Sequence, residues 1–342
     1  MLKRKDRLKM KSWLSSHQLI LSEQYNNATL PHAILINGVS GSGKLALAQW
    51  LIQLLNCKQP NNVIESNEML LQGCGHCKSC LLLNSHTFPD HLNLVAQKNS
   101  IGVDDVRLAN SFLQKTAYLG QFKTVLIDNA QTMTHAAMNA LLKTLEEPSD
   151  HSVIILLTND SESLLPTIIS RCRVLNIRPA VGEALILQLK EQNIENGDLT
   201  VETNALSTDP FVNLTQLPEL TNATINEAFN VFKKCYIEYI CYQQGESQLL
   251  QHLLNNEHAL RWLEQITVNL QRQYVLNNID NEHKKRLNAE LLNKLYKVII
   301  NGCKVIKSYT QANKQFVCEQ LIMSMSDVLE QNQSEVNANT PV

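Results

Sequence analysis

The sequence predicts an α/β domain built on a parallel sheet, followed by an all-helical C-terminal part. In the first half of the chain, short apolar runs alternate with longer amphipathic stretches, which is the pattern of βα units around a parallel sheet. After Pro179 this strand pattern stops and helical periodicity continues, with few Gly or Pro residues to interrupt it. A glycine-rich segment after the first apolar run supports the assignment, because phosphate-binding loops join a strand to a helix.

The first half contains five apolar runs that we interpret as strands. They lie at Ala33–Asn37, His91–Val95, Thr124–Asp128, Ser152–Thr158 and Val174–Ile177. Helices are expected between them at Lys44–Leu55, Val103–Thr116, Thr134–Leu145 and Ser161–Ile169. This alternation places a P-loop-type α/β domain in residues 1–178.

The second half is expected to be helical throughout. We place a domain boundary near residue 178 and a small helical domain over residues 179–221, with Gly197, Pro210 and Pro218 in its loops. A separate helical bundle over residues 222–330 follows. Its long helical patterns lie at Ala228–Gln244, Ala259–Leu276, Asn288–Ser308 and Phe316–Glu330. The polar tail, residues 331–342, is expected to be disordered.

Composition excludes several classes of protein. The chain has 342 residues, a net charge of −2 and 44% hydrophobic residues, which excludes a wholly disordered chain and gives no global attraction to nucleic acid. No apolar run approaches the roughly 18 residues of a membrane span. The basic start, residues 1–11, lacks a signal-type apolar core. We expect a cytoplasmic protein whose first residues are a solvated leader, with Met10 as an alternative start.

A group of cysteines has the spacing of a metal site. Three of them stand two residues apart in a glycine-containing loop and a fourth lies upstream: Cys74, Cys77, Cys80 and Cys57. Four thiolates satisfy tetrahedral Zn²⁺. Cys57 is our choice for the fourth ligand, with His76 and His86 as alternatives. Because no ligand position looks open, we expect a structural zinc site, since catalytic zinc keeps one position free.

The glycine-rich segment matches a P-loop with one departure. It reads Gly38-Val39-Ser40-Gly41-Ser42-Gly43-Lys44-Leu45. Its glycines allow backbone N–H groups to cradle phosphates, and Lys44 would reach the terminal phosphates. The next position, where a Ser or Thr hydroxyl holds Mg²⁺, is Leu45.

A second departure follows the third predicted strand. Asp128 stands where a Walker B aspartate helps to hold magnesium. Its neighbour Asn129 stands where many ATPases carry the Glu that activates water, and an amide cannot act as a base. Losing the metal hydroxyl and the base together predicts an ATPase frame without turnover. We expect nucleotide binding to be weak or absent.

Two further motifs carry a resemblance to a known family. The run Asn139–Pro148, which reads Asn-Ala-Leu-Leu-Lys-Thr-Leu-Glu-Glu-Pro, and the triplet Ser170-Arg171-Cys172 resemble the AAA+ clamp-loader family, which includes bacterial DNA polymerase III subunits and replication factor C. The cysteine group looks like the zinc module of the bacterial members, over about residues 57–86. The resemblance is strong from about Ala33 to Pro179. It implies an AAA+ domain with a zinc-module insertion, a helical lid domain and an all-α collar domain.

The resemblance also implies roles for particular residues. Arg171 would be an arginine finger, which reaches the ATP site of a neighbouring subunit and stabilises charge on the transferred phosphoryl group. Thr158 aligns with the family's sensor position. The degenerate nucleotide site would consist of Gly38, Gly41, Gly43, Lys44, Asp128 and Thr158. The zinc ligands would be Cys57, Cys74, Cys77 and Cys80, although the family spacing between the first two is shorter.

The function implied by the resemblance is that of a non-hydrolysing clamp-loader subunit in a hetero-oligomeric ring. Its partners would be the tau/gamma ATPase subunits and the delta subunit, and through the complex the sliding clamp and primed DNA. One alternative is an active ATPase of the tau/gamma type, against which Leu45 and Asn129 argue. Another is a zinc-dependent nucleic-acid-binding module, which the charge balance disfavours. Glu146 and Glu147 diverge by about 100° on a helix and are expected to end it, not to share an active site.

Overall fold

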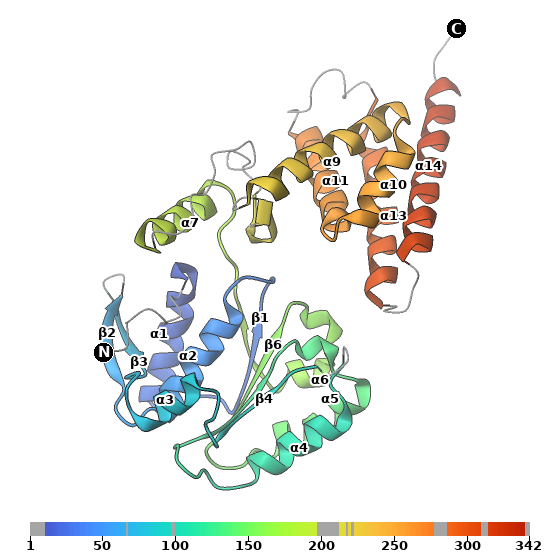
Figure 1. The fold of residues 1–342 in the computed structure, drawn as a ribbon. Coiled ribbons are helices and arrows are strands. Elements are labelled where there is room, and N and C mark those ends of the chain that lie inside the picture. The colour runs from blue at the N-terminus through green and yellow to red at the C-terminus, as the bar shows by residue number, and fades with distance from the viewer. Residues whose placement is uncertain are drawn as a thin grey trace. The chain divides into compact units, whose positions relative to one another are not determined.

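The computed structural model describes residues 11–65, 68–96, 100–196, 212–216, 218–219, 222–276, 286–308 and 314–338. These residues form two compact units, each described by itself below (Figure 1). The first unit holds the described residues up to Gln216, and the second holds those from Pro218 onward. The basic start up to Met10 and the predicted loop residues Gly197 and Pro210 lie outside the described residues.

A five-stranded parallel sheet forms the centre of the first unit, in the order β4-β5-β6-β1-β7. The strands are β1 (Ala33–Asn37), β4 (His91–Leu94), β5 (Lys123–Ile127), β6 (Ser152–Thr158) and β7 (Arg173–Asn176). All five predicted strands are confirmed, with ends that differ by at most one residue. β1 pairs with β6 on one side and β7 on the other, so the glycine-rich loop leaves the interior of the sheet.

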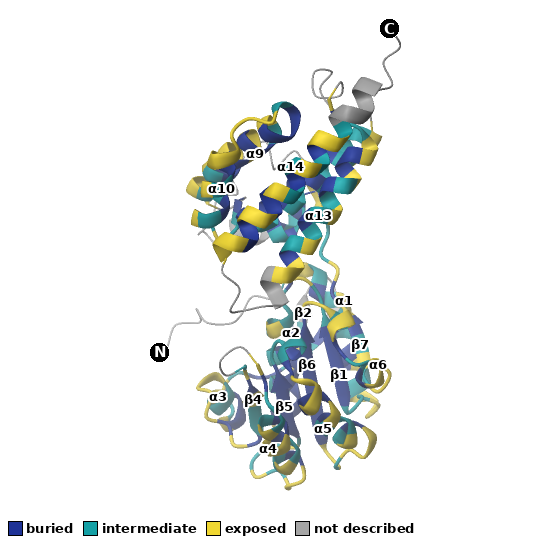
Figure 2. Cartoon of the chain, turned by 90° about the vertical axis from the view of Figure 1, so that its right-hand side faces the viewer, coloured by how far each residue is buried: buried dark blue, intermediate teal, exposed yellow. Residues whose placement is uncertain are grey.

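Helices cover both faces of this sheet. They are α1 (Ser15–Asn26), α2 (Lys44–Asn56), α4 (Val103–Leu113), α5 (His135–Glu146) and α6 (Pro166–Ile169), and a further helix, α7 (Glu183–Asn196), follows β7. Because successive strand residues point to opposite faces, Leu35 enters the core against α4 and α5, and Ile36 enters the core against α1 and α2. The three central strands, β5, β6 and β1, are buried on both sides (Figure 2), which explains their near-continuous apolar sequences, whereas the edge strands β4 and β7 are partly exposed.

Several elements of the first unit were not predicted. They are α1 with the 3₁₀ helix η1 (Ser12–Leu14) before it, the antiparallel hairpin β2 (Asn61–Glu65) and β3 (Glu68–Gln72), the helix α3 (Lys78–Asn84), and the 3₁₀ helices η2 (Ala130–Thr132) and η4 (Leu214–Gln216). The hairpin and α3 fill the stretch that we interpreted as a zinc module. Periodicity did not reveal α1 because two of its three buried residues, Gln18 and Ser22, are polar.

The predicted helix Ser161–Ile169 is wrong as a single helix. The chain forms the 3₁₀ helix η3 (Ser161–Ser163), passes through an extended Leu165 and starts α6 at Pro166. Proline disfavours helical geometry in the residue before it and is well suited to the first helical position. Pro166 therefore starts a new helix. The other three predicted helices of this unit are confirmed with small shifts at their ends.

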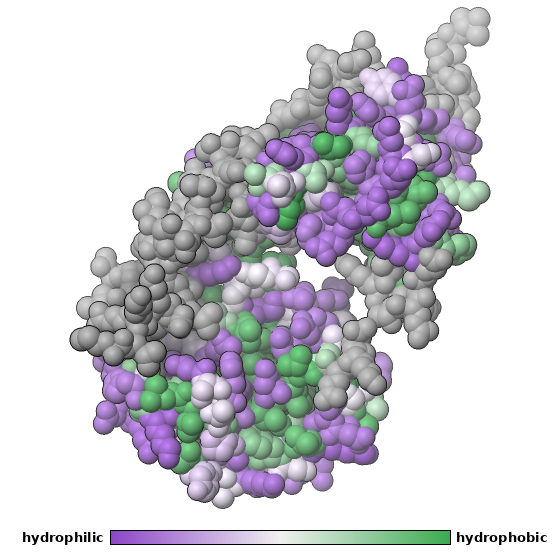
Figure 3. All heavy atoms as spheres, in the orientation of Figure 1, coloured by the Kyte–Doolittle hydropathy of each residue, from purple (hydrophilic) through white to green (hydrophobic). Residues whose placement is uncertain are grey.

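The second unit is a helical bundle, as predicted. Its helices are α9 (Ala223–Tyr242), α10 (Glu246–Asn255), α11 (Ala259–Val275), α13 (Ala289–Ser308) and α14 (Lys314–Ala338). Trp262 anchors the core, with its ring centroid 5.6 Å from that of Phe229. Hydrophilic residues cover most of the described surface of this unit on the face in Figure 3, with hydrophobic residues between them.

Two expectations about the second half need comment. α14 continues through Ala338, so residues 331–338 of the expected disordered tail are helical, and no Gly or Pro lies between Glu330 and Ala338 to end the helix. The contacts group α7 with the first unit, and the separate lid domain over residues 179–221 stays a prediction. Among the described helices, none has the length and apolar character needed to cross a bilayer.

Candidate functional site

The glycine-rich loop joins β1 to α2 in the geometry that its sequence predicts. Gly41 and Gly43 have φ angles of +79° and +93°, in the left-handed region that favours glycine. A Cβ on Gly43 would lie 2.8 Å from Leu14 Cδ1, and one on Gly38 would lie 3.0 Å from the carbonyl oxygen of Ile177. The glycines are therefore required by backbone conformation and by close packing around the loop.

The side chain of Lys44 is satisfied by oxygens of the protein itself. Its Nζ donates to the carbonyl oxygens of Gly38 and Val39, at 2.7 and 2.9 Å, and to Asn159 Oδ1 at 2.7 Å. Burial lowers the pKa of Lys44, while the nearby Asp128 carboxylate opposes this shift. An ammonium group has three donors, so all of them have acceptors here. A nucleotide phosphate would have to compete with these contacts.

Two residues near the start of the described chain also contact this loop: Lys11, just before η1, and Trp13, within η1. Lys11 Nζ donates to the carbonyl oxygen of Gly41 at 2.6 Å, and Trp13 Nε1 donates to that of Ser42 at 2.9 Å. The sequence did not predict either contact. The two residues belong to no motif, and their contacts with the loop depend on how η1 packs in the fold. Lys44 thus contacts carbonyl oxygens in the first half of the loop, and Lys11 and Trp13 contact those in its second half.

Three positions that would bind magnesium, activate water or act as the sensor either lack the required polar group or use it in hydrogen bonds within the protein. Leu45 is 42% exposed and offers only an apolar side chain. Asn129 adopts a left-handed conformation, and its Oδ1 accepts from Gln131 Nε2 at 3.3 Å. Thr158 Oγ1 lies 3.0 Å from Gln131 Oε1 and 2.7 Å from the carbonyl oxygen of Asp160, so this buried hydroxyl is already satisfied.

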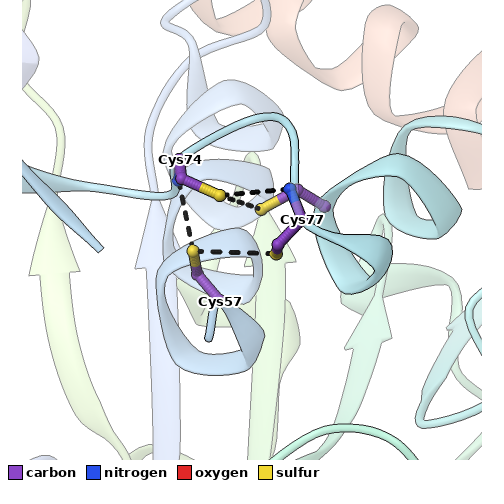
Figure 4. A group of neighbouring side chains, drawn as sticks. Cys57, Cys74 and Cys77 are labelled. Atoms are coloured by element: carbon purple, nitrogen blue, oxygen red, sulfur yellow. Dashed lines mark hydrogen bonds between the residues drawn. The ribbon is translucent and has the colours of Figure 1, made fainter. Parts of the chain in front are cut away.

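The four cysteines of the predicted metal site come together. Cys57 follows the end of α2, Cys74 lies in the loop after β3, and Cys77 and Cys80 lie at the start of α3 (Figure 4). Their four Sγ atoms all lie within 4.8 Å of one another. The alternative ligand His76 instead places its Nδ1 2.9 Å from the carbonyl oxygen of Cys74.

The distances in this cluster fit a tetrahedral metal ion. The Sγ atoms of Cys57 and Cys77 are 4.0 Å apart, and those of Cys74 and Cys80 are 3.9 Å apart. A tetrahedron with Zn–S bonds of about 2.3 Å requires sulfur separations of about 3.8 Å. The N–H groups of Cys74 and Cys77 also donate to cluster sulfurs, each at 3.2 Å. These four residues could therefore hold a metal ion.

The protonation of the cysteines supports the same conclusion. Burial would raise the pKa of Cys77, but backbone N–H groups of Lys58 and Cys80 lower it to about 6. Burial raises the pKa of Cys57 and Cys80. Four thiolates this close together repel one another, so a cation is needed to keep all of them ionised.

Arg171 lies away from the loop, just after α6. Its Nη1 donates to the carbonyl oxygen of Thr167 at 3.0 Å, and its Nη2 forms an ion pair with Glu146 Oε1 at 2.7 Å. The side chains of Arg171 and Glu146 are 36% and 50% exposed. Glu146 ends α5, as predicted, but its contact with Arg171 was not expected from the sequence.

The chain is similar in sequence to known proteins over the part that contains these features. The family model described as DNA polymerase III, delta subunit, matches residues 15–181, which include the glycine-rich loop, the cysteine cluster and Arg171. The DNA polymerase III subunit delta' of Escherichia coli (strain K12) is 29% identical over 332 residues, which are 93% of this chain and 96% of that protein. The subunit delta' of Haemophilus influenzae is 31% identical over 257 residues, which are 74% of this chain and 73% of that protein.

A subunit with a different name is also similar. The DNA polymerase III subunit tau/gamma of Haemophilus influenzae is 27% identical over 309 residues, which are 80% of this chain and 43% of that protein.

Proposed function

Because this chain belongs to the family of DNA polymerase III delta-prime subunits, we propose that it works in the sliding-clamp loader as a subunit that does not hydrolyse ATP. The AAA+ fold of its first unit then serves as a structural part of the loader. Its partners are the tau/gamma and delta subunits in a hetero-oligomer, and through that complex the clamp and primed DNA. The similarity to a tau/gamma subunit supports a place in the loader, because the subunits of the clamp-loader family share one fold.

The replacements at Leu45 and Asn129 carry the proposal that ATP is not hydrolysed. Leu45 supplies no magnesium ligand and Asn129 supplies no base. Each departure alone would slow hydrolysis, because one removes a ligand of the metal and the other removes the group that activates water. A bound phosphate would in addition have to replace the contacts of Lys44 with Gly38, Val39 and Asn159.

Arg171 gives the chain a catalytic role in a neighbouring subunit. An arginine finger has to project from the protein surface, and its guanidinium has to remain charged. Arg171 is partly exposed and follows directly after α6, in the Ser-Arg-Cys triplet that resembles the family motif. In the loader, its guanidinium would stabilise charge on the γ-phosphoryl group bound by a tau/gamma subunit.

The metal of the cysteine cluster is proposed to be structural zinc. Thiolate ligands in tetrahedral geometry favour Zn²⁺, and four protein ligands leave no position for water or substrate. The ion would join the end of α2 to the loop after β3 and to the start of α3. A reducing compartment keeps such thiols available for a metal, so we retain the cytoplasm as the proposed location.

The test is the ATPase rate of a reconstituted loader in the presence of clamp and primed DNA. We compare complexes that contain this chain as wild type or as Arg171→Ala, with the isolated chain as a control. We expect the isolated chain to hydrolyse no ATP. In the Arg171→Ala complex, we expect ATP hydrolysis at the neighbouring site that Arg171 serves to fall about 10³-fold or more, the effect that is typical of arginine fingers.

Other outcomes would contradict specific parts of the proposal. Normal turnover with Arg171→Ala, in a complex that assembles normally, would make Arg171 structural. Magnesium-dependent hydrolysis by the isolated chain would instead favour an active ATPase of the tau/gamma type. Tight DNA binding by the isolated chain, lost on chelation, would favour the nucleic-acid-binding module.

A further inference from the structure

We infer that Glu146 is a positioning residue that holds the guanidinium of Arg171 ready for a neighbouring nucleotide. This inference rests on the proposed function of Arg171 as an arginine finger. Two contacts fix the guanidinium in the chain, the ion pair with Glu146 and the hydrogen bond to the carbonyl oxygen of Thr167. The first comes from the end of α5 and the second from α6, so the side chain is held between two elements.

The two contacts leave the guanidinium able to bind a phosphate. A guanidinium has five N–H donors in a rigid plane. Glu146 and Thr167 take one donor each, from Nη2 and Nη1, which leaves three donors for a ligand. A single carboxylate oxygen of Glu146 is 2.7 Å from Arg171, so the pair is not a bidentate clamp that would occupy a whole edge of the guanidinium.

Holding the side chain matters because arginine is flexible. A free arginine side chain loses much rotamer freedom when it engages a phosphate, and a side chain that is already held loses less. The adjacent Glu147 offers a natural control. It is also an exposed carboxylate, but among the described residues it forms no ion pair. The two glutamates carry the same charge and differ in their contact with Arg171.

The experiment uses the reconstituted loader with clamp and primed DNA. The complexes carry wild type, Glu146→Gln, Arg171→Ala, the double variant Glu146→Gln/Arg171→Ala, or the control Glu147→Gln. ATP turnover is measured together with assembly by size-exclusion chromatography. We expect Glu146→Gln to lower kcat about two- to fivefold, the size of effect that an exposed ion pair supplies. Glu147→Gln should leave kcat unchanged.

The double variant separates positioning from a structural role. If Glu146 acts through Arg171, then Glu146→Gln lowers kcat only when Arg171 is present and has no effect in the Arg171→Ala background. An equal loss in both backgrounds would overturn the inference, as would an unchanged or raised kcat for Glu146→Gln. If Arg171→Ala itself leaves turnover unchanged, the proposed function fails, and the positioning role of Glu146 fails with it.

Discussion

The three ammonium donors of Lys44, in the phosphate-binding loop, all have acceptors within the protein. Its amine contacts three oxygens of the chain, and Lys11 and Trp13 donate to two further carbonyl oxygens of the loop. An ATP molecule would have to displace the contacts of Lys44 and would find no hydroxyl at Leu45 for its magnesium. We therefore expect weak nucleotide binding even though the glycines keep the P-loop conformation.

We expect millimolar Mg-ATP to leave the melting temperature of the isolated chain unchanged. A ligand present at about 100 times its Kd would add about 2.7 kcal/mol to the free energy of unfolding, so micromolar binding would be visible. Differential scanning fluorimetry of wild type and Lys44→Met, each with and without ATP, checks this. A rise in the wild type that disappears in Lys44→Met would show a working site.

Asp90 is a buried carboxylate that organises the turn before β5. It accepts hydrogen bonds from the backbone N–H groups of Tyr118, Leu119 and Gly120 at 2.6 to 2.8 Å, and it pairs with Lys123 Nζ at 3.1 Å. Burial by itself would raise the pKa of Asp90, but these donors hold it below the ordinary value.

Replacing Asp90 by Asn should lower the free energy of unfolding by about 3 kcal/mol, because it leaves Lys123 buried without its partner. Urea denaturation at neutral pH measures this. The matched control is Asp104→Asn, an exposed aspartate paired with Arg107, for which we expect a loss within about 1 kcal/mol. Equal losses for the two variants would contradict the role of Asp90.

The same carboxylate predicts a pH dependence. Since its folded-state pKa is depressed, the stability that it contributes is complete above the unfolded-state pKa of about 3.9 and is lost as the pH falls from there through the folded-state pKa. The difference in unfolding free energy between wild type and Asp90→Asn should therefore shrink below about pH 4. A difference that stays constant from neutral pH to pH 3 would show that ionisation of Asp90 does not matter.

The cysteine cluster joins α2 to the loop after β3 and to α3, in addition to the hydrogen bonds from Trp50 to the carbonyl oxygen of Leu71 and from Gln53 to Asn84. We expect about one zinc per chain in metal analysis. Cys80→Ser should lose most of this zinc and lower the melting temperature of the first unit by several degrees, at about 2–4 °C for each kcal/mol in a unit of about 200 residues. Cys241→Ser, a buried cysteine in α9, should keep the zinc.

α14 carries exposed apolar side chains that we propose bind another subunit of the loader. Phe316 and Met323 are 62% and 69% exposed and lie seven residues apart, on one face of the helix. Their double replacement by Ser should weaken incorporation of the chain into the loader at least tenfold, because buried aromatic anchors often supply more than 1.4 kcal/mol to an interface. Quantitative pull-down with the tau/gamma and delta subunits measures this.

The control for α14 is Leu108→Ser, which removes an apolar side chain that is 58% exposed on α4 of the first unit. It should leave incorporation unchanged. The circular dichroism spectra of all variants should match the wild type, because each replaced side chain is exposed. If the double variant of α14 assembles normally, this face of the helix does not bind another subunit.

Across the whole chain, sequence periodicity predicted the elements that are buried on both sides or amphipathic. The three central strands are apolar runs between helices, and the predicted ends of all five strands differ by at most one residue from the structure. Periodicity did not find α1, whose buried face is partly polar, and joined η3 to α6 because Pro166 was not weighed as a helix start. Both errors arise where the hydrophobic periodicity is not decisive: α1 buries polar side chains through tertiary packing, and the single residue Pro166 starts a new helix.

The sequence by itself determined which chemical groups are present. Leu45 and Asn129 lack a hydroxyl and a carboxylate wherever they lie, and the spacing of three cysteines is local. Only the tertiary structure decided the contacts between distant segments: Asn159 with Lys44, Trp13 with the loop, and Glu146 with Arg171. The physical reason is that side-chain identity is a local property, whereas a contact across the fold depends on how strands and helices pack.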